Sequence, residues 1–333
     1  MTNDVTMPGG SDFKDRKTGL IVFGILEIIF GAFCALMVPL MIFGTLAATA
    51  LNKSAAQSMS PDVMVPGILF YAFLAVWFIW LGIGSIKARR WARALWLIAS
   101  LVWLISGIIG WVFTLLFLPD IYDQMGASGQ MPQSVTTVVK TVMIGFMTVF
   151  YVIVPGILVL FYGSRHVKAT CERMDPQVRW TDKCPLPVLA ISLMAGFWAA
   201  CMLFMGFYNW ALPFFGYILT GMAGAAVAIA SMLLLVYVAW GVYKLNIKAW
   251  WGAVLLTIIW GVSLQVTFSR MGLMEYYEKM NFHAEQLAII KRCGVTQSSW
   301  IVMFSLLWVF VALAYLLCVR KYFPSSAQHN VSE

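Results

Sequence analysis

The chain has 333 residues, of which 62% are hydrophobic and only 11% are charged. Soluble globular domains contain about 45–50% apolar and about 25% charged residues, so this composition excludes an ordinary water-soluble protein and indicates an integral membrane protein. The net charge of +8 does not indicate nucleic acid as a partner, because the basic residues lie in short clusters between apolar runs. Composition therefore predicts the lipid bilayer as the partner.

Residues 1–18 are polar and of mixed sign, and we expect them to form a cytoplasmic tail rather than a cleaved signal peptide. Eight apolar runs follow, each long enough to cross a hydrocarbon core of about 30 Å, which takes about 20 helical residues. They lie at about 19–45, 65–86, 92–118, 138–163, 186–208, 220–243, 250–269 and 299–320. The chain is still apolar at 46–51 and 211–219, so the first and sixth helices are expected to extend past the membrane face.

The distribution of Lys and Arg predicts that both termini are cytoplasmic. If the N-terminus is inside, sixteen of the 22 basic residues lie in inner segments and six lie in outer ones. An odd number of spans would mix these clusters across the two faces, so the bias also supports eight spans. We therefore expect a multi-pass protein of the cytoplasmic membrane.

An internal repeat divides the predicted all-α fold. A displacement of 159 residues places "LGIGSIKARRWARAL" (81–95) on "WGVYKLNIKAWWGAV" (240–254), with Gly82 on Gly241. We expect two tandem four-helix transmembrane units, 19–163 and 186–320, joined by a cytoplasmic linker at 164–185 and followed by a cytoplasmic tail at 321–333. Both units would enter the membrane in the same orientation, as parallel repeats. The residues expected to anchor the inner turns in the headgroup layer are Arg89, Arg90, Trp91, Lys248 and Trp250.

The loop at 271–294 is expected to form a short amphipathic helix on the outer face, because Met274, Tyr277, Leu287 and Ile290 recur at helical spacing among charged residues. The six cysteines include no CxxC pair, and only Cys293 is clearly on the predicted outer side. A framework of disulfides is therefore not expected.

Glu27 is the one ionisable residue clearly inside an apolar run. Lys17 marks the inner end of that run, and ten residues at about 1.5 Å each place Glu27 on the order of 15 Å deeper, near the bilayer middle. Gly24, Gly31 and Cys34 share its helix face, and small residues allow a second helix to approach closely. We therefore expect Glu27 to point into the bundle. Aligning Gly31 with Gly196 places Ser192 at the corresponding position of the second unit.

The same depth count gives Glu27 its expected partners. It brings Trp77, Ser100 and Pro155 to a similar level. Proline cannot donate to the carbonyl four residues earlier, so Pro155 leaves the Tyr151 carbonyl free to accept a proton from a neutral Glu27. Trp77 and Ser100 could donate to the other carboxyl oxygen. We favour a structural hydrogen bond between helices, and the alternative is a proton or ion site.

No catalytic set is predicted for this chain. Phosphate-binding, dinucleotide-binding and HExxH motifs are absent, and none of the three histidines lies in a span, so we expect no metal and no cofactor. We expect a structural or partner-binding membrane subunit that associates with other membrane subunits or with copies of itself. The alternative is a small-solute or ion transporter with Glu27 as its proton-coupling site and Asn209, Ser263 and Gln265 as polar lining. An intramembrane enzyme acting on lipid or quinone is a third hypothesis, and the sequence offers no evident catalytic set for it.

Overall fold

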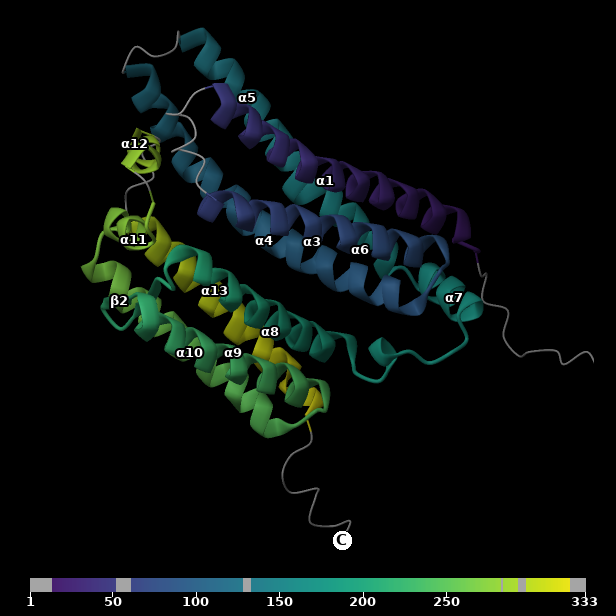
Figure 1. The fold of residues 1–333 in the computed structure, drawn as a ribbon. Coiled ribbons are helices and arrows are strands. Elements are labelled where there is room, and N and C mark those ends of the chain that lie inside the picture. The colour runs from purple at the N-terminus through teal and green to yellow at the C-terminus, as the bar shows by residue number, and fades with distance from the viewer. Residues whose placement is uncertain (1–13, 52–60, 128–132, 283, 293–297, 324–333) are drawn as a thin grey trace, which may run out of the picture. The chain divides into compact units, whose positions relative to one another are not determined.

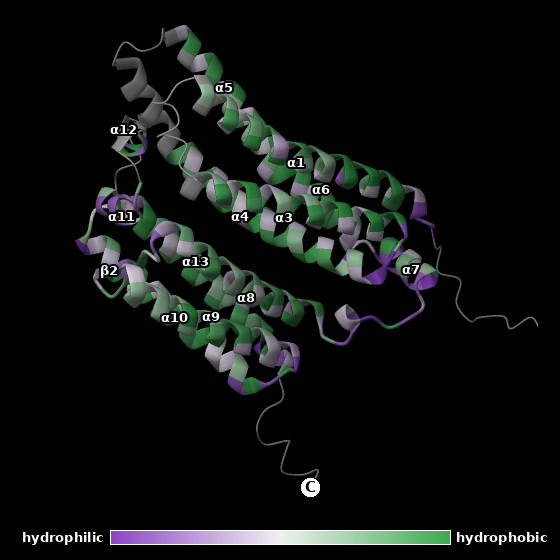
Figure 2. Ribbon diagram, in the orientation of Figure 1, coloured by the Kyte–Doolittle hydropathy of each residue, from purple (hydrophilic) through white to green (hydrophobic). Residues whose placement is uncertain are grey.

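The computed structural model describes residues 14–51, 61–127, 133–282, 284–292 and 298–323 (Figure 1). Within these ranges the fold is all-α apart from one small β-hairpin. Eight of the described helices are long and apolar enough to cross a membrane. Figure 2 shows hydrophobic residues running along these helices, while hydrophilic residues gather at α7 and at helix ends. The predicted helical class and the eight apolar spans are confirmed.

The spans lie in α1 (Lys17–Leu51), α3 (Pro61–Ile86), α4 (Arg90–Ala127), α5 (Gln133–Thr148) with α6 (Val154–Gly163), α8 (Leu186–Phe204), α9 (Gly221–Tyr243), α10 (Ile247–Arg270) and α13 (Ser298–Val319). A π-helical turn, Val149–Ile153, joins α5 to α6, so the two form one span. Three shorter helices are α7 (Arg165–Met174), α11 (Leu273–Lys279) and α12 (Ala284–Arg292). The predicted extension of the first helix through 46–51 is confirmed, because α1 ends at Leu51.

The chain forms two compact units. Unit 1 contains residues 1–35, 73–111 and 142–182, and unit 2 contains residues 36–72, 112–141 and 183–333. Unit 1 therefore holds parts of α1, α3, α4 and α5 together with α6 and α7. Unit 2 holds the remaining parts of the first helices and all of α8 to α13. The tandem division into 19–163 and 186–320 stays a prediction.

In unit 1, α1 and α3 approach closely along a line of glycines. A Cβ added to Gly24 would lie 2.7 Å from the carbonyl oxygen of Gly82, and one added to Gly31 would lie 3.2 Å from that of Ala75. No other residue type would allow this approach without moving a helix, since those neighbours are backbone atoms. The predicted close-packing face of the first helix is confirmed, and its partner is α3.

The α3–α4 turn and the α9–α10 turn have the same backbone hydrogen bonds. Arg89 N donates to Gly84 O and Ala88 N to Ser85 O; Asn246 N donates to Gly241 O and Leu245 N to Val242 O, all at 2.9 Å. Ala88 and Leu245 both have positive φ, at 48° and 58°. The two turns are separated by 157 residues, whereas the predicted displacement is 159. The difference arises because the prediction aligned Gly241 with Gly82, while the carbonyl that closes the first turn belongs to Gly84.

In unit 2, α8 packs against α9, and α10 packs against α9 and α13. Ser192 Oγ donates to the Ala239 carbonyl at 2.7 Å, which joins α8 to α9. Ala239 is 157 residues after Gly82, the residue that faces Glu27 in unit 1, and Ser192 is 165 residues after Glu27. A repeat that relates the two contacts would therefore need a different displacement for each helix of the pair.

Residues 211–219 do not extend the sixth helix, and that prediction is wrong. They form an antiparallel hairpin of β1 (Leu212–Phe214) and β2 (Tyr217–Leu219), with Leu212 opposite Leu219. The helix cannot start earlier because Pro213 interrupts the helical pattern and Gly216 and Gly221 have φ of 96° and 55°. The helix α9 accordingly begins at Gly221, after the hairpin.

The predicted amphipathic helix at 271–294 is two short helices, α11 and α12. Leu273 is buried, and Tyr276 packs edge-on against Phe268 of α10 with ring centroids 5.5 Å apart. The Tyr276 hydroxyl donates to the Ala211 carbonyl at 3.2 Å, and burial raises the pKa of this tyrosine to about 12. These contacts hold α11 against the end of α10 and the base of the hairpin.

Candidate functional site

Glu27 belongs to a buried chain of hydrogen bonds that joins three helices of unit 1. The Tyr162 hydroxyl of α6 donates to Glu27 Oε1 at 2.7 Å. Tyr162 O also lies 2.8 Å from Ser85 Oγ of α3, and Ser85 must be the donor there because the Tyr162 proton is already directed at Glu27. Glu27 is 6% exposed, and Ser85 and Tyr162 are at most 1% exposed. The predicted inward orientation of Glu27 is confirmed.

One half of this site lacks a well-aligned hydrogen bond. Glu27 Oε2 and the Trp96 indole nitrogen are both buried without a well-aligned hydrogen-bond partner among the described residues, although Trp96 lies close enough to interact with the Glu27 carboxyl group. Trp96 of α4 stacks on the Tyr162 ring, with centroids 6.1 Å apart and planes 11° from parallel. An unpaired carboxyl oxygen and an unpaired N–H donor beside one tyrosine are groups that a bridging water molecule could satisfy.

Glu27 lies close to the ends of its neighbouring helices. Gly82 lies against Glu27 Cβ, and α3 ends four residues later at Ile86. Four helical residues rise about 6 Å, so the level of Glu27 is about 6 Å from the end of α3. Tyr162 is likewise one residue from the end of α6. Glu27 is ten residues, or about 15 Å, from the start of α1 at Lys17, so α1 begins several residues beyond the end of α3. The depth of Glu27 in a bilayer stays a prediction.

The start of α1 lies against α7 and the end of α6. Arg16 N donates to Thr170 Oγ1 of α7 at 3.1 Å, and the Gly19 Cα faces the Phe161 ring of α6. Lys17 and Thr18 are nevertheless exposed. The start of α1 thus contacts α7 on one side and extends beyond the end of α3, so Lys17 is not level with that helix end, although it is the last basic residue before the apolar run.

None of the three predicted partners bonds to Glu27. Trp77 packs between Phe73 and Trp80, with centroids 6.0 and 6.3 Å away. Ser100 Oγ is fully buried and donates to the Leu97 carbonyl of its own helix at 3.2 Å.

Tyr151 lies in the π-helical turn, and its carbonyl faces Gly107 of α4. The π-helical turn ends at Ile153, two residues before the proline at 155, where the regular helical bond would be missing. The partners that the sequence reasoning missed are Ser85, Trp96 and Tyr162. A depth count started from the ends of α3 and α6 would have placed Ser85 and Tyr162 beside each other.

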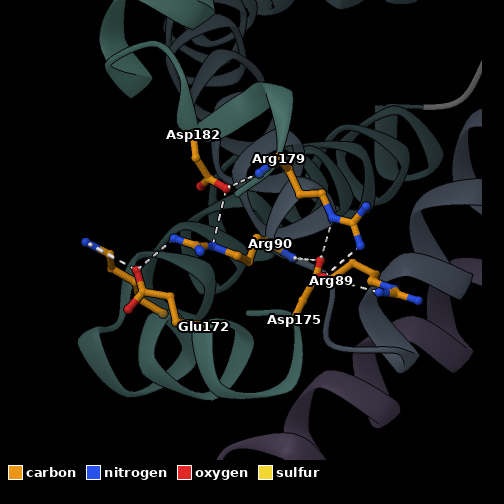
Figure 3. Close-up of polar contacts among 7 residues, drawn as sticks. Arg89, Arg90, Glu172, Asp175, Arg179 and Asp182 are labelled. Carbon is orange, nitrogen blue, oxygen red and sulfur yellow. Dashed lines mark hydrogen bonds and ion pairs between the residues drawn. The ribbon is translucent and has the colours of Figure 1, made fainter. Parts of the chain in front are cut away.

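A second polar cluster surrounds Asp175 in the linker (Figure 3). Arg179 binds this carboxylate through two bonds, Nη2 to Oδ1 at 2.8 Å and Nε to Oδ2 at 3.1 Å. Arg89 Nη1 reaches Oδ1 at 3.2 Å, and Arg90 N donates to Oδ2 at 3.4 Å. The Asp175 side chain is 1% exposed. Hydrogen bonds from Arg179, with those from Arg90 N and the nearby guanidinium charges, hold the pKa of Asp175 below its ordinary value.

Arg90 extends this cluster to two further acids. Its Nε lies 3.3 Å from Asp182, and its Nη2 lies 3.5 Å from Glu172, which also pairs with Lys168 at 3.8 Å. Figure 3 shows these side chains converging from the α3–α4 turn, α7 and the segment that follows α7. The cluster fastens the linker to the α3–α4 turn within unit 1.

The five predicted interface anchors have different surroundings. Arg89 and Arg90 pair with the acids above, and Trp91 stacks on Trp80 with centroids 4.3 Å apart. Lys248 is exposed. Trp250 is 2% exposed, and its indole nitrogen donates to the Leu316 carbonyl of α13 at 3.0 Å. Trp250 therefore joins α10 to α13 and does not reach a lipid headgroup.

The polar residues considered for a solute path in the second half are each engaged in unit 2. Asn209 Nδ2 donates to the Lys279 carbonyl at 3.1 Å, and Ser263 Oγ donates to the Pro213 carbonyl at 2.9 Å. Gln265 Nε2 donates to Val302 O of α13 and to Ser305 Oγ at 3.0 and 2.7 Å. All three side chains therefore make structural contacts.

The described residues contain neither a disulfide nor a cluster of metal ligands. The described cysteines are free thiols, and Cys293, the cysteine predicted to be on the outer side, lies outside the described residues. Burial raises the pKa of the Cys171 thiol to about 11. Among the described residues, no three His, Cys, Asp or Glu side chains gather as metal ligands would.

The candidate site is thus the hydrogen-bonded chain of Glu27, Tyr162 and Ser85 together with Trp96. A comparison of the chain with protein-family models, curated proteins and solved structures finds no match in any of the three.

Proposed function

We propose that this chain is a non-catalytic integral membrane protein, a structural or partner-binding subunit whose polar interior residues hold its helices together. The observation that carries the proposal is the bond from Tyr162 to Glu27, which closes a buried link between α1, α3 and α6. In an apolar environment such a bond stabilises a helix pair because the alternative is an unsatisfied polar group. The polar residues of α8 to α13 considered above serve similar links.

We propose further that the chain crosses the cytoplasmic membrane eight times with both termini inside, as two parallel four-helix units. The matched turns at Gly84 and Gly241 support the repeat. A topology test supports or refutes this arrangement. A reporter that folds only in the cytoplasm should be active when fused after residue 323 or at residue 14, and inactive when inserted after Asn281.

The partner is proposed to be another membrane subunit or a second copy of this chain. Large apolar side chains are exposed along the spans, such as Phe310 of α13 at 71% and Leu160 of α6 at 77%. Lipid or another apolar helix can cover such a surface. Cross-linking in native membranes, followed by mass spectrometry of the products, should give a defined dimer or hetero-complex, and a product distribution that follows total protein density would contradict the proposal.

The structural interpretation is tested at Glu27 itself. Glu27→Gln keeps an oxygen that can accept from Tyr162, so folding, yield and association with partners should stay near those of the parent chain. Glu27→Leu removes the acceptor and should lower the unfolding midpoint. If Glu27→Gln folds normally but abolishes the biological effect of the protein, the structural interpretation is wrong.

A second candidate function is proton-coupled transport of a small solute or ion. The observation that favours it is that neither Glu27 Oε2 nor Trp96 Nε1 has a well-aligned hydrogen bond, because a carboxyl group bonded in good geometry through one oxygen keeps a position for a proton or water on the other. Under this proposal, a pH gradient across proteoliposomes should drive uptake that Glu27→Gln abolishes while folding stays normal. Uptake that continues in the Glu27→Gln variant would exclude Glu27 as the coupling site.

A further inference from the structure

The turn of the β1–β2 hairpin holds an aromatic residue in left-handed backbone, although a smaller residue would form the same turn with less strain. Its two-residue loop, Phe215 and Gly216, has positive φ at both positions, 44° and 96°, which matches a type I′ turn. Asn, Asp or Gly usually occupies the first of these positions, since left-handed backbone costs other residues about 1–2 kcal/mol. An aromatic residue is held there instead.

The hairpin is fastened to α10 by two buried hydroxyl groups. Ser263 Oγ accepts from Phe215 N at 3.1 Å and donates to the Pro213 carbonyl, while Thr267 Oγ1 accepts from Gly216 N at 3.0 Å. Both hydroxyls are at most 1% exposed. The turn thus has its backbone N–H groups satisfied by protein and does not depend on water for them, as non-helical backbone at membrane depth requires.

The bonding partners also give the level of the turn along α10. Ser263 and Thr267 lie seven and three residues before α10 ends at Arg270, which correspond to about 10 and about 4.5 Å. The 24 residues of α10 span about 36 Å, somewhat more than the hydrocarbon core of about 30 Å. If α10 crosses the membrane as proposed, the turn lies at the boundary between hydrocarbon and headgroups.

The side chains that the hairpin exposes are aromatic. Leu212 and Ile218 point to protein and are buried, whereas Phe214, Phe215 and Tyr217 are 37%, 40% and 70% exposed. Met222, at the start of α9, is 90% exposed beside them. The terminal guanidinium of Arg270 lies beside Gly216, which adds a cation at the same level. Aromatic rings with a nearby cation are the side chains that favour the membrane interface.

We propose that the β1–β2 hairpin is a lipid anchor, whose rings Phe214, Phe215 and Tyr217 insert among phospholipids at the membrane face where α10 ends. The occupant of this surface is lipid rather than a protein partner, because the rings lie at the level of the interface and Arg270 complements phosphate there. The proposal depends on the membrane insertion of α10 proposed above.

Collision measurements on nitroxide labels test the anchor. The label is placed on Tyr217→Cys in a chain whose six cysteines are replaced by Ala, reconstituted into vesicles of phosphatidylcholine and phosphatidylglycerol. Two references calibrate the scale. Asn281→Cys lies in the exposed turn between α11 and α12, and Leu233→Cys lies in the middle of α9 at 61% exposure. Met222→Cys reports the same surface if the Tyr217 variant does not fold.

The anchor predicts that the Tyr217 label collides at least threefold less with a water-soluble nickel chelate than the Asn281 label, and less with oxygen than the Leu233 label. A Tyr217 label as accessible to nickel as the Asn281 label, with the Leu233 label protected, would overturn the anchor and leave membrane insertion intact. Nickel access at Leu233 as well would overturn the insertion on which the anchor depends.

Discussion

Removal of the Tyr162 hydroxyl should reveal how much the buried link contributes to stability. Tyr162→Phe deletes one group that donates to Glu27 Oε1 and accepts from Ser85 Oγ, and it leaves the ring and its stacking on Trp96 in place. Glu27 would then have no well-aligned hydrogen bond on either oxygen among the described residues, because Oε2 already has none, and only Trp96 and Ser85 would remain close to the carboxyl group.

The magnitude follows from the two bonds that are lost. Hydrogen bonds between transmembrane helices contribute about 0.6 kcal/mol on average and up to about 1.7 kcal/mol. The Tyr162–Glu27 bond is short, at 2.7 Å, and both groups are buried, so it belongs near the upper end of that range. With the Ser85 bond added, we expect Tyr162→Phe to lower the free energy of unfolding by about 2 kcal/mol.

A double-mutant cycle with Glu27→Leu isolates the pair. Reversible unfolding in mixed micelles of detergent and dodecyl sulfate gives the free energies of the parent, the two single variants and the double variant. The double variant should cost less than the sum of the single ones by about 1–1.5 kcal/mol, because it leaves neither member of the Tyr162–Glu27 pair without the other. Additive costs would refute the link. A Glu27→Leu variant more stable than the parent would also refute it and would favour a carboxyl retained for proton chemistry.

Three further predictions concern unit 1. Because Arg179 lowers the pKa of Asp175 in the folded state, the contribution of this carboxylate to stability is present at neutral pH and is lost as pH falls through and below about 4. The free energy of unfolding of Asp175→Asn should therefore be lower than that of the parent by about 1–3 kcal/mol at pH 7, and the two values should approach each other in acid. Gly82→Val places side-chain atoms against the backbone of α1 and should destabilise by about 1–3 kcal/mol, whereas Gly156→Ala, where a Cβ meets nothing within 4 Å, should be neutral or stabilising; equal thermal shifts would contradict the packing. The Cys171 thiol, 1% exposed with its pKa raised to about 11, should react with maleimide at pH 7 at least a hundredfold more slowly in the folded protein than in denaturant, and rapid labelling of folded protein would exclude its burial.

Parts of the site could be predicted because they depend on one helix at a time. The face shared by Gly24, Glu27 and Gly31 follows from helical periodicity, and small residues on that face indicate a close neighbour. The structure places α3 there. Ser192 was likewise found from the spacing of small residues alone, and it bonds to Ala239 of the neighbouring helix.

The partners of Glu27 could not be obtained in this way, because they depend on how far each helix extends past its neighbours. Lys17 is a poor marker of level, since the start of α1 continues beside α7. The expected partners Trp77, Ser100 and Tyr151 lie on the same spans as Ser85, Trp96 and Tyr162, but they are displaced from them by eight, four and eleven residues.

The sequence by itself determined the helical class, the eight apolar spans and the inward face of Glu27. These features follow from the properties of a lipid environment. Backbone polar groups in hydrocarbon must form their hydrogen bonds within the helix, and ionisable side chains must face the protein interior instead of lipid. Only the tertiary structure decided the bond between Glu27 and Tyr162, which are 135 residues apart, the Asp175 cluster and the hairpin at Phe215. Those features arise from contacts between distant segments, and local pattern does not specify which of many compatible side chains will meet.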